Sequence, residues 1–278
     1  MSNANAIKTF RDLLSFLTII PLGETEDFVV TSARNMWLFP LIGGLIGLFA
    51  AGYFAASGFV FSFVLVLVNF VVHVPSGLLL QFVPPAMTLA FLLVLTGFQH
   101  FDGLVDLGNA VGLKRVEDRR EIAHRWVVTY RGALLAIFVE FSAFAGLFLL
   151  NWSFALRGLI VAEVAAKLAM VTITWHGKPA HVGLGARFLG QAKRNLNVLA
   201  YVFSFVIGFA FLGLAGLLVI GATVLLGLLM EGVGNSVFGG VSGDMIGATN
   251  EATRAMTLVL IAGFSFLLPY TLAGALAL

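Results

Sequence analysis

Long apolar runs, separated by short polar segments, dominate the chain. Three runs contain no Asp, Glu, Lys or Arg: residues 35–101, 195–230 and 255–278. A helix needs ~20 mostly apolar residues to cross the hydrocarbon core of a bilayer, so runs of this length are typical of transmembrane helices. The runs are continuous and do not alternate every second residue, which argues against a membrane β-barrel. The pattern therefore predicts an all-α, polytopic membrane helix bundle.

Serine, glycine and proline residues divide these runs into about seven predicted spans. In the first run we expect breaks at residues 57–58, 75–77 and 84–85, which leave three spans, or two spans and a re-entrant segment. An even number of crossings favours the re-entrant version if the N-terminal helix lies on the same side as the later polar loops. The segments that could span the membrane are 36–56, 59–74, 84–100, 132–151, 154–175, 196–213, 215–230 and 256–277.

Residues 7–20 predict an amphipathic helix that lies in the membrane interface. Its apolar positions recur at helical spacing: Ile7, Phe10, Leu13, Leu14 and Leu17. Its polar face carries Lys8, Arg11, Asp12 and Ser15. Pro21 and Gly23 end the helix.

Three polar loops, residues 101–131, 176–194 and 231–254, lie between the spans. Two spans separate each loop from the next, so all three face the same side of the membrane. The first two loops hold ten Lys and Arg residues, and the positive-inside rule places such loops in the cytoplasm. We expect residues 1–278 to form one integral domain of the cell (inner) membrane, with an active site that faces the cytoplasm.

Composition narrows the functional classes. Hydrophobic residues make up 60% of the chain and charged residues only 11%, against roughly 25% charged residues in soluble proteins. The net charge of +2 and the scattered basic residues argue against nucleic acid as a partner. The lipid bilayer is the expected partner, and a homo-oligomer is left open. With no cysteine, the chain has no disulfide, thiol nucleophile or thiolate metal site.

A pair of carboxylates follows the first apolar run. If the helix continues there, Asp102 and Asp106 lie one turn apart on one face, and Asn109 extends that face. Two carboxylates at this spacing, near a membrane, repel each other, and a bound divalent cation relieves the repulsion. Oxygen ligands suit Mg²⁺. The alternative is a solvated pair that caps a helix or forms salt bridges with Arg125 or Arg131.

A glycine-rich segment precedes the last apolar run. Gly239, Gly240 and Gly243 let backbone amides approach an anion closely, as phosphate-binding loops do. Asp244 would then be a third metal ligand, or the base that accepts a proton from an attacking hydroxyl. An aspartate that starts a helix after a flexible turn would show the same pattern.

Two further features offer cations for phosphate. Lys167 follows Glu163 by four residues inside a predicted span, so it either points at a substrate phosphate or is neutralised by that glutamate. Lys178 and Arg187 lie in a basic, glycine-rich loop, which either binds phosphate or has ordinary cytoplasmic loop composition.

The two aspartate motifs together resemble those of the cobalamin synthase family, the adenosylcobinamide-GDP ribazoletransferases. Residues 100–106, HFDGLVD, resemble the family's H-L-D-G-L-x-D, and residues 239–248, GGVSGDMIGA, resemble its G-G-x-[ST]-G-D-x-x-G-A. Residues 16–23, 37–47 and 183–185 also resemble family motifs, in the same order. The chain differs at Asn109, where bacterial members usually carry Asp, and at residues 123–130, where a conserved family stretch is degraded.

The resemblance implies a magnesium-dependent membrane phosphotransferase. Such an enzyme joins adenosylcobinamide-GDP to α-ribazole, or to α-ribazole 5′-phosphate, and releases GMP. On this interpretation the metal ligands are Asp102, Asp106, Asp244 and the amide of Asn109. One of these aspartates, or His100, takes the hydroxyl proton, and the phosphate contacts are Lys167, Lys178, Arg187, Gly239, Gly240 and Gly243.

Two other functions remain as alternatives. A lipid-forming enzyme of the CDP-alcohol phosphotransferase type would need a different aspartate spacing and a second aspartate pair. A cation-coupled transporter would place its carboxylates near the middle of the bilayer.

Overall fold

The computed structural model describes residues 3–22, 27–123, 125, 127–182 and 184–267, and within these residues the chain is almost entirely helical. The isolated bridge between Pro179 and Val241 is the only β-type pairing in this part of the chain. The all-α prediction is therefore confirmed. The helices are α1 (Asn3–Leu17), α2 (Phe28–Arg34), α3 (Phe39–Asn69), α4 (Ser76–Leu95), α5 (Gln99–Ala110), α6 (Val116–Ala123), α7 (Tyr130–Leu149), α8 (Trp152–His176), α9 (Leu184–Ala192), α10 (Val198–Phe238) and α11 (Gly243–Leu267).

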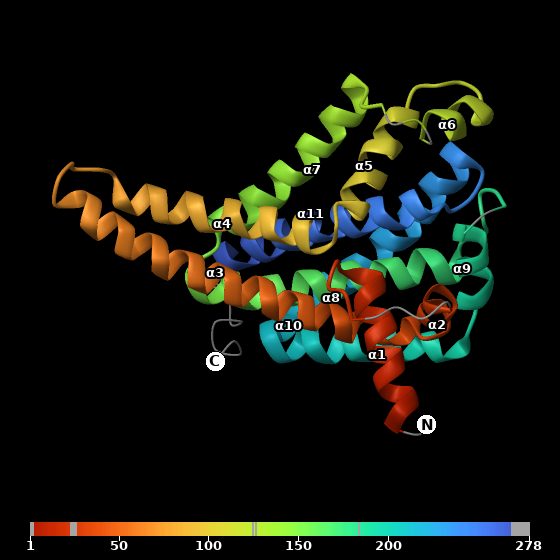
Figure 1. Ribbon diagram of the computed structural model, residues 1–278, viewed down its shortest axis with the longest axis horizontal. Helices are drawn as coiled ribbons and strands as arrows, with labels where there is room; N and C mark the ends of the chain where they lie inside the picture. Colours follow the sequence, from red (N-terminus) through yellow and green to blue (C-terminus); the bar gives the residue numbers. More distant parts are fainter. Residues whose placement is uncertain (1–2, 23–26, 124, 126, 183, 268–278) are drawn as a thin grey trace.

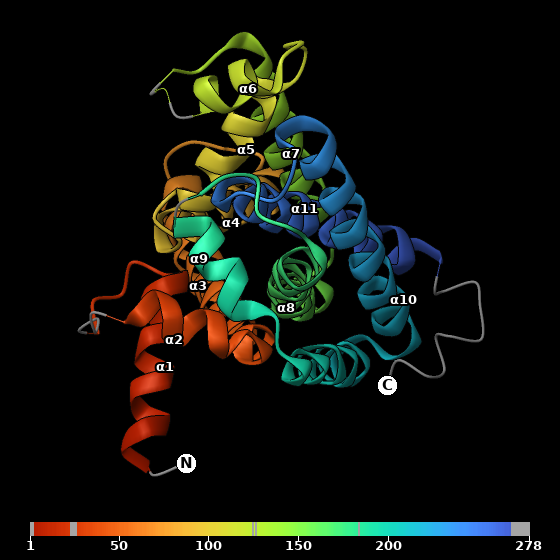
Figure 2. The same cartoon turned by 90° about the vertical axis from the view of Figure 1, so that its right-hand side faces the viewer.

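Helices α8 and α11 form the centre of the bundle (Figures 1 and 2). Helix α8 packs against α3, α10 and α11, while α11 also packs against α5 and α7. Small residues allow the closest approaches. A Cβ on Gly43 of α3 would lie 2.5 Å from the carbonyl oxygen of Glu163, and one on Gly47 would lie 2.6 Å from the Cα of Ile160. Glycines four residues apart are a common solution for helices that pack within a membrane.

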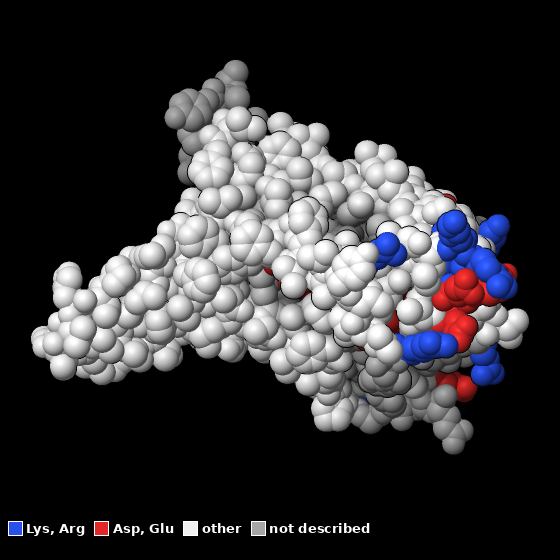
Figure 3. Space-filling model, turned by 90° about the horizontal axis from the view of Figure 1, so that it is seen from above, with Lys and Arg blue, Asp and Glu red and all other residues white. Residues whose placement is uncertain are grey.

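Four segments of the described chain are long and apolar enough to cross a membrane: Met36–Asn69, Ser76–Leu95, Tyr130–Leu149 and Asn195–Phe238. The helical hairpin of α3 and α4 extends beyond the rest of the bundle (Figure 1). In Figure 3 the charged side chains gather at the opposite end of the molecule, and most of this face carries no Lys, Arg, Asp or Glu. These features are those of an integral membrane protein.

The first apolar run folds differently from the prediction. The break expected at Ser57 and Gly58 is absent, because α3 continues through both residues. Ser57 donates from Oγ to the carbonyl of Phe54 within the helix. The lack of a side chain at Gly58 leaves room for the ring of Trp152, since a Cβ there would lie 2.5 Å from the indole. The run thus forms two long helices, α3 and α4, and not three spans.

The two prolines of α4 do not break that helix either. Pro84 and Pro85 lie within it, and the hydroxyl of Thr88 donates to the carbonyl of Pro84 over 2.8 Å. The predicted boundary near Pro75 is confirmed, because α4 starts at the next residue.

A sharp kink divides α10 where the sequence predicts two spans. Gly213 has φ 58° and ψ −138°, a conformation outside the helical region that favours glycine. Gly208 and Gly216 then touch, since a Cβ on Gly216 would lie 1.8 Å from the carbonyl oxygen of Gly208. The second half of α10 continues to Phe238, beyond the predicted end at residue 230.

The three polar segments are largely helical, which the sequence did not predict. Helices α5 and α6 lie within residues 101–131, α9 lies within 176–194, and the end of α10 and the start of α11 fill most of 231–254. The polar residues of these segments suggested loops. They belong instead to short helices or helix ends, which pack against the bundle with one side and expose polar residues on the other.

Helix α1 spans Asn3–Leu17, somewhat earlier than predicted. Its second half packs into the protein: Leu13 and Leu17 are buried, whereas Ile7 and Phe10 are 62% and 45% exposed. Asp12, expected on the polar face, is also fully buried, because α2 packs beside it, with Ser32 donating to its carbonyl.

Candidate active site

A tight turn sets the direction of α5. Gly97 and Phe98 both have positive φ, 64° and 57°, and Phe98 is the only non-glycine residue with positive φ in the described part of the chain. The backbone nitrogen of Asp102 donates to the carbonyl of Phe98 over 2.9 Å, so the helix begins at once. Asp102 and Asp106 consequently lie one turn apart on α5, as a continuous helix there requires. A strained residue of this kind is often found beside a functional site.

Two glycines let α5 and α11 meet backbone to backbone. A Cβ on Gly103 would lie 2.4 Å from the carbonyl oxygen and 2.9 Å from the Cα of Asp244. On the other helix, a Cβ on Gly247 would lie 3.0 Å from the Cα of His100. Consecutive Cα atoms are about 3.8 Å apart, so the Cα atoms of Asp102 and Asp244 lie within about 8 Å of each other. Carboxylates far apart in the sequence therefore converge.

The glycine-rich segment turns the chain from α10 into α11. Gly239, with φ 75°, ends α10 in the left-handed conformation typical of a helix terminus. Gly240 passes close to the preceding loop, since a Cβ there would lie 2.7 Å from the nitrogen of Ala180. The structure thus gives these two glycines a role in the turn, and their contact with phosphate stays a prediction.

The same segment caps α11 and attaches the basic loop to it. Val241 donates to the carbonyl of Lys178 over 2.7 Å and accepts from the nitrogen of Ala180 over 3.0 Å. The hydroxyl of Ser242 accepts from the nitrogen of Met245 over 3.3 Å, which is an N-cap. Gly243, the first residue of α11, remains exposed and lines a cavity.

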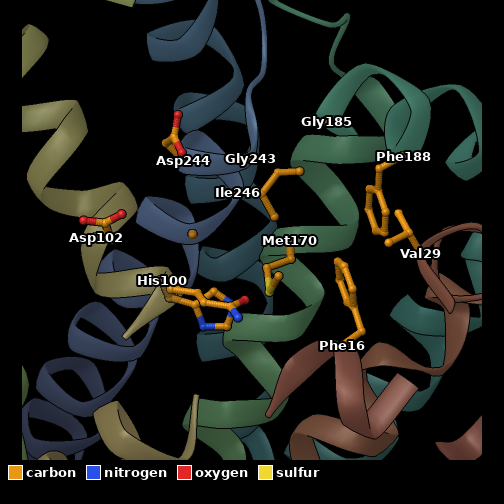
Figure 4. A pocket seen from close by; sticks show the side chains of 12 residues that line it. Phe16, Val29, His100, Asp102, Met170, Gly185, Phe188, Gly243, Asp244 and Ile246 are labelled. Carbon is orange, nitrogen blue, oxygen red and sulfur yellow. The ribbon is translucent and has the colours of Figure 1, made fainter. Parts of the chain in front are cut away.

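Two neighbouring cavities share Asp102 and Asp244 in their walls. The first has a volume of about 330 Å³ and its remaining lining is mostly apolar (Figure 4). The second has a volume of about 360 Å³, and Asp106 and Arg125 line it. The two shared carboxylates consequently lie where the contents of the two cavities would meet.

Negative charge accumulates at this junction. Burial, and then the nearby carboxylates of Asp244 and Asp102, together raise the pKa of Asp106 to about 7. Such repulsion favours a bound cation. No group of three or more His, Cys, Asp or Glu residues in the described part of the chain is placed to hold a metal ion. The donor set fits Mg²⁺, which usually takes one or two carboxylates and completes its shell with water and substrate oxygens.

His100 lines the first cavity beside the carboxylates. Its Nδ1 lies 3.9 Å from a carboxylate oxygen of Glu251. Burial is the main cause that lowers the pKa of His100 well below its usual value.

Lys167 lies elsewhere and does not line either cavity. Its Nζ donates to Glu163 over 3.2 Å and to Asn250 over 2.7 Å, and the side chain is fully buried. Glu163 also accepts from Arg254 over 2.5 Å, and Arg254 donates to Glu251. The alternative of a neutralised lysine is therefore favoured, and the predicted phosphate contact of Lys167 is not.

Asn109 is also engaged in another role. Its Oδ1 accepts from the backbone nitrogen and the hydroxyl of Thr129 over 2.9 and 2.8 Å. Its Nδ2 donates to the carbonyl of Val127 over 2.8 Å. The amide thus holds the segment before α7 against α5, and this geometry does not support the prediction that Asn109 is a metal ligand.

The basic residues are distributed differently from the prediction. Lys178 and Arg187 are exposed and line neither cavity, although Gly185 of the same loop lines the first. Arg125, which the sequence offered only as a partner for the aspartates, lines the second cavity and pairs with Glu121. Nothing in the sequence distinguishes it from the five other basic residues of its segment.

Comparison with known proteins gives one consistent result. Residues 9–262 match the family model described as cobalamin-5-phosphate synthase. A protein of Halorubrum lacusprofundi is 32% identical over 91% of this chain and 95% of its own length. Proteins of Methanosarcina barkeri and Clostridium novyi are each 27% identical over 91% of this chain, and over 91% and 95% of their own lengths. All three are named adenosylcobinamide-GDP ribazoletransferase. No solved structure matches the chain significantly.

Proposed function

Because this chain belongs to the cobalamin-5-phosphate synthase family, a family of transferases in cobalamin synthesis, we propose that it joins adenosylcobinamide-GDP to α-ribazole or α-ribazole 5′-phosphate. The observation that carries the proposal is the convergence of Asp102 and Asp244 between two cavities. A transferase with two large substrates needs two binding spaces that open onto one reaction centre.

The proposed reaction exchanges one phosphorus–oxygen bond for another. The ribose hydroxyl of the acceptor attacks the phosphorus that is joined to cobinamide. The bond from that phosphorus to the bridging oxygen breaks, and GMP leaves with this oxygen and its negative charge. The hydroxyl proton passes to a basic group at the site. The products are the phosphodiester of the cobamide, GMP and one proton.

Charge neutralisation is the main requirement of such a transfer. Asp102, Asp106 and Asp244 would surround Mg²⁺, with one or two of these carboxylates as direct ligands and water and substrate oxygens completing the shell. The ion, when bound, neutralises the diphosphate and the charge that develops on the leaving oxygen. Arg125 places a guanidinium in the second cavity, where it can pair with a phosphate oxygen. A carboxylate of the site, or His100, would accept the hydroxyl proton; this is supported by their position in the lining of the first or the second cavity.

The arrangement of helices supports a topology of seven spans. The segments are α3, α4, α7, α8, the two halves of α10 on either side of Gly213, and α11. In this topology α5, α6, α9 and the turn before α11 all lie on one side of the membrane, which the basic residues of these segments identify as the cytoplasm. Charged side chains gather at one end of the molecule (Figure 3), as this topology requires. Helix α1 would lie in the interface at that end.

The direct test is product formation by the purified protein. Detergent-solubilised protein is mixed with adenosylcobinamide-GDP, α-ribazole and Mg²⁺, and the cobamide and GMP are measured by chromatography and mass spectrometry. Asp102→Asn, Asp106→Asn and Asp244→Asn should each abolish GMP release while the protein still inserts and purifies. Glu117→Gln, at an exposed carboxylate of α6, is the matched control. Absence of product where a known synthase is active would contradict the proposal.

A further inference from the structure

We propose that the first cavity is the acceptor subsite, and that Phe16 and Phe188 bind the aromatic base of the ribazole. This assignment rests on the function proposed above and deepens it. The cavity joins two kinds of wall that a nucleoside would need: carboxylates at one side and aromatic side chains at the other.

Figure 4 shows how the cavity is divided. Asp102 and Asp244 lie at one side, and Phe16, Val29 and Phe188 lie together at the opposite side. The apolar side chains of Met170 and Ile246 lie between them, together with the imidazole of His100, and the amide of Gln99 also lines the cavity. A nucleoside placed along this cavity would direct its ribose toward the carboxylates and its base toward the phenylalanines.

The aromatic wall has the form of a stacking surface. The rings of Phe16 and Phe188 are 5.1 Å apart between centroids and are nearly parallel, at 9°. The ring of Phe39 packs beside both, at centroid distances of 6.0 and 6.4 Å, and is itself fully buried. Flat aromatic bases gain about 1–3 kcal/mol from stacking on such side chains. The volume of about 330 Å³ falls at the lower end of ligand pockets and suits one nucleoside.

The chemistry of the wall distinguishes the two substrates. The base of α-ribazole is a dimethylbenzimidazole, which presents methyl groups and few hydrogen-bonding atoms at its edges. Guanine presents several donors and acceptors, and burying them without partners costs free energy. Phe16, Val29, Met170 and Phe188 offer such an edge no side-chain donor or acceptor. The guanidinium of Arg125 lies in the other cavity, which therefore suits the nucleotide diphosphate.

Peripheral helices build this wall. Phe16 comes from α1, Val29 from α2 and Phe188 from α9. Helices α2 and α9 are tied together by Arg34, which donates from Nε to Gln191 over 2.9 Å. Gly185 at the start of α9 approaches the nitrogen of Gly243, to which a Cβ would be 3.3 Å distant. These short helices thus complete the site next to the carboxylates.

The test separates the Michaelis constants of the two substrates. Phe188→Ala and Phe16→Ala should each raise KM for α-ribazole about 10-fold, the loss expected for one stacking partner, and leave KM for adenosylcobinamide-GDP within about 2-fold. Calorimetric titration with α-ribazole alone should show the same weakening, because it needs no turnover. Phe148→Ala, at a half-buried ring on α7 far from the cavity lining, is the matched control and should change neither value.

The KM values of the two substrates decide whether the first cavity binds the ribazole base or guanine. If a Phe188 variant does not fold, Val29→Trp, at a partly exposed position, narrows the same cavity and should raise KM for α-ribazole alone. A rise in KM for adenosylcobinamide-GDP instead would overturn the assignment and place guanine in the cavity. Unchanged KM values for both substrates would also overturn it. These results require an active wild-type protein, whereas an inactive wild-type protein would refute the proposed function, and the assignment with it.

Discussion

Replacing Gly103 with alanine tests whether the contact between α5 and α11 sets the geometry of the reaction centre. The added Cβ would lie 2.4 Å from the carbonyl oxygen of Asp244. Carbon and oxygen atoms ordinarily approach to about 3.3 Å, so the two helices must separate by roughly 1 Å. A change of side-chain rotamer cannot relieve this contact, because the obstructing atoms are backbone atoms of Asp244.

The expected consequence is a loss of rate that exceeds the loss of stability. Overpacking of this kind costs about 1–3 kcal/mol, which lowers the melting temperature but leaves the protein folded. Displacement of a reacting or metal-binding group by ~1 Å can cost about 100-fold in rate. We therefore expect Gly103→Ala to lower kcat about 100-fold, with Mg²⁺ and both substrates saturating.

The assay combines GMP release with thermal unfolding of the purified protein in detergent. Gly52→Ala in α3 is the matched control: a Cβ there meets no atom within 4 Å, so both kcat and melting temperature should stay close to wild type. A Gly103→Ala protein that is folded and turns over at the wild-type rate would refute the reasoning, because the contact would then have no bearing on catalysis.

Three further predictions concern charge. Glu163→Gln should destabilise the protein by about 3–5 kcal/mol, since it leaves the buried cations of Lys167 and Arg254 without a shared partner; an unchanged melting temperature would contradict this. Arg125→Ala should raise KM for adenosylcobinamide-GDP about 10-fold, whereas the exposed Arg115→Ala should not; equal effects would remove Arg125 from the site. Treatment with EDTA should stop GMP release and added Mg²⁺ should restore it, and full activity after removal of metal would contradict the proposed ion.

The class of fold could be predicted from the sequence, but several helix boundaries could not. Runs without charge are long enough to require helices in a membrane, and this physical constraint does not depend on tertiary contacts. The positions at which these helices are interrupted, in contrast, do depend on tertiary contacts. Gly58 and Gly213 look alike in the sequence, yet Gly58 lies within a helix that accommodates Trp152, whereas Gly213 adopts a non-helical conformation. Which glycine interrupts a helix is decided by the neighbouring helix.

The candidate site, like the fold, could be predicted from the sequence only in part. The pairing of Asp102 with Asp106 is local, so helical periodicity was sufficient to predict it. The approach of Asp244 is not local: the glycine-rich segment suggested it as a third metal ligand, but helical periodicity alone could not place it beside the other two carboxylates. Arg125 was missed for the same reason, because its place beside the carboxylates depends on the path of the chain between α6 and α7.

Asn109 and Lys167 show the limit of assigning chemistry from residue type alone. Both are polar residues in apolar surroundings, which in a membrane protein indicates function by default. Their donors and acceptors are instead used within the protein, by Thr129 in one case and by Glu163 and Asn250 in the other. A buried polar group needs partners whether or not it binds a ligand. Its residue type therefore predicts that it is paired, and only the fold determines with what.

The glycines of the two aspartate motifs connect these observations. Gly103 and Gly247 permit backbone contact between α5 and α11, while Gly240 fits the turn against residues 178–180 and Gly239 lies beside the side chain of Arg120 on α6. Glycines of a flexible loop need no close neighbours, but here each of the four meets a neighbouring atom within 3.0 Å of its missing Cβ. Gly103 and Gly247 thereby allow α5 and α11 to approach backbone to backbone. Carboxylates on two such helices can share one ion, which is what the proposed transfer requires.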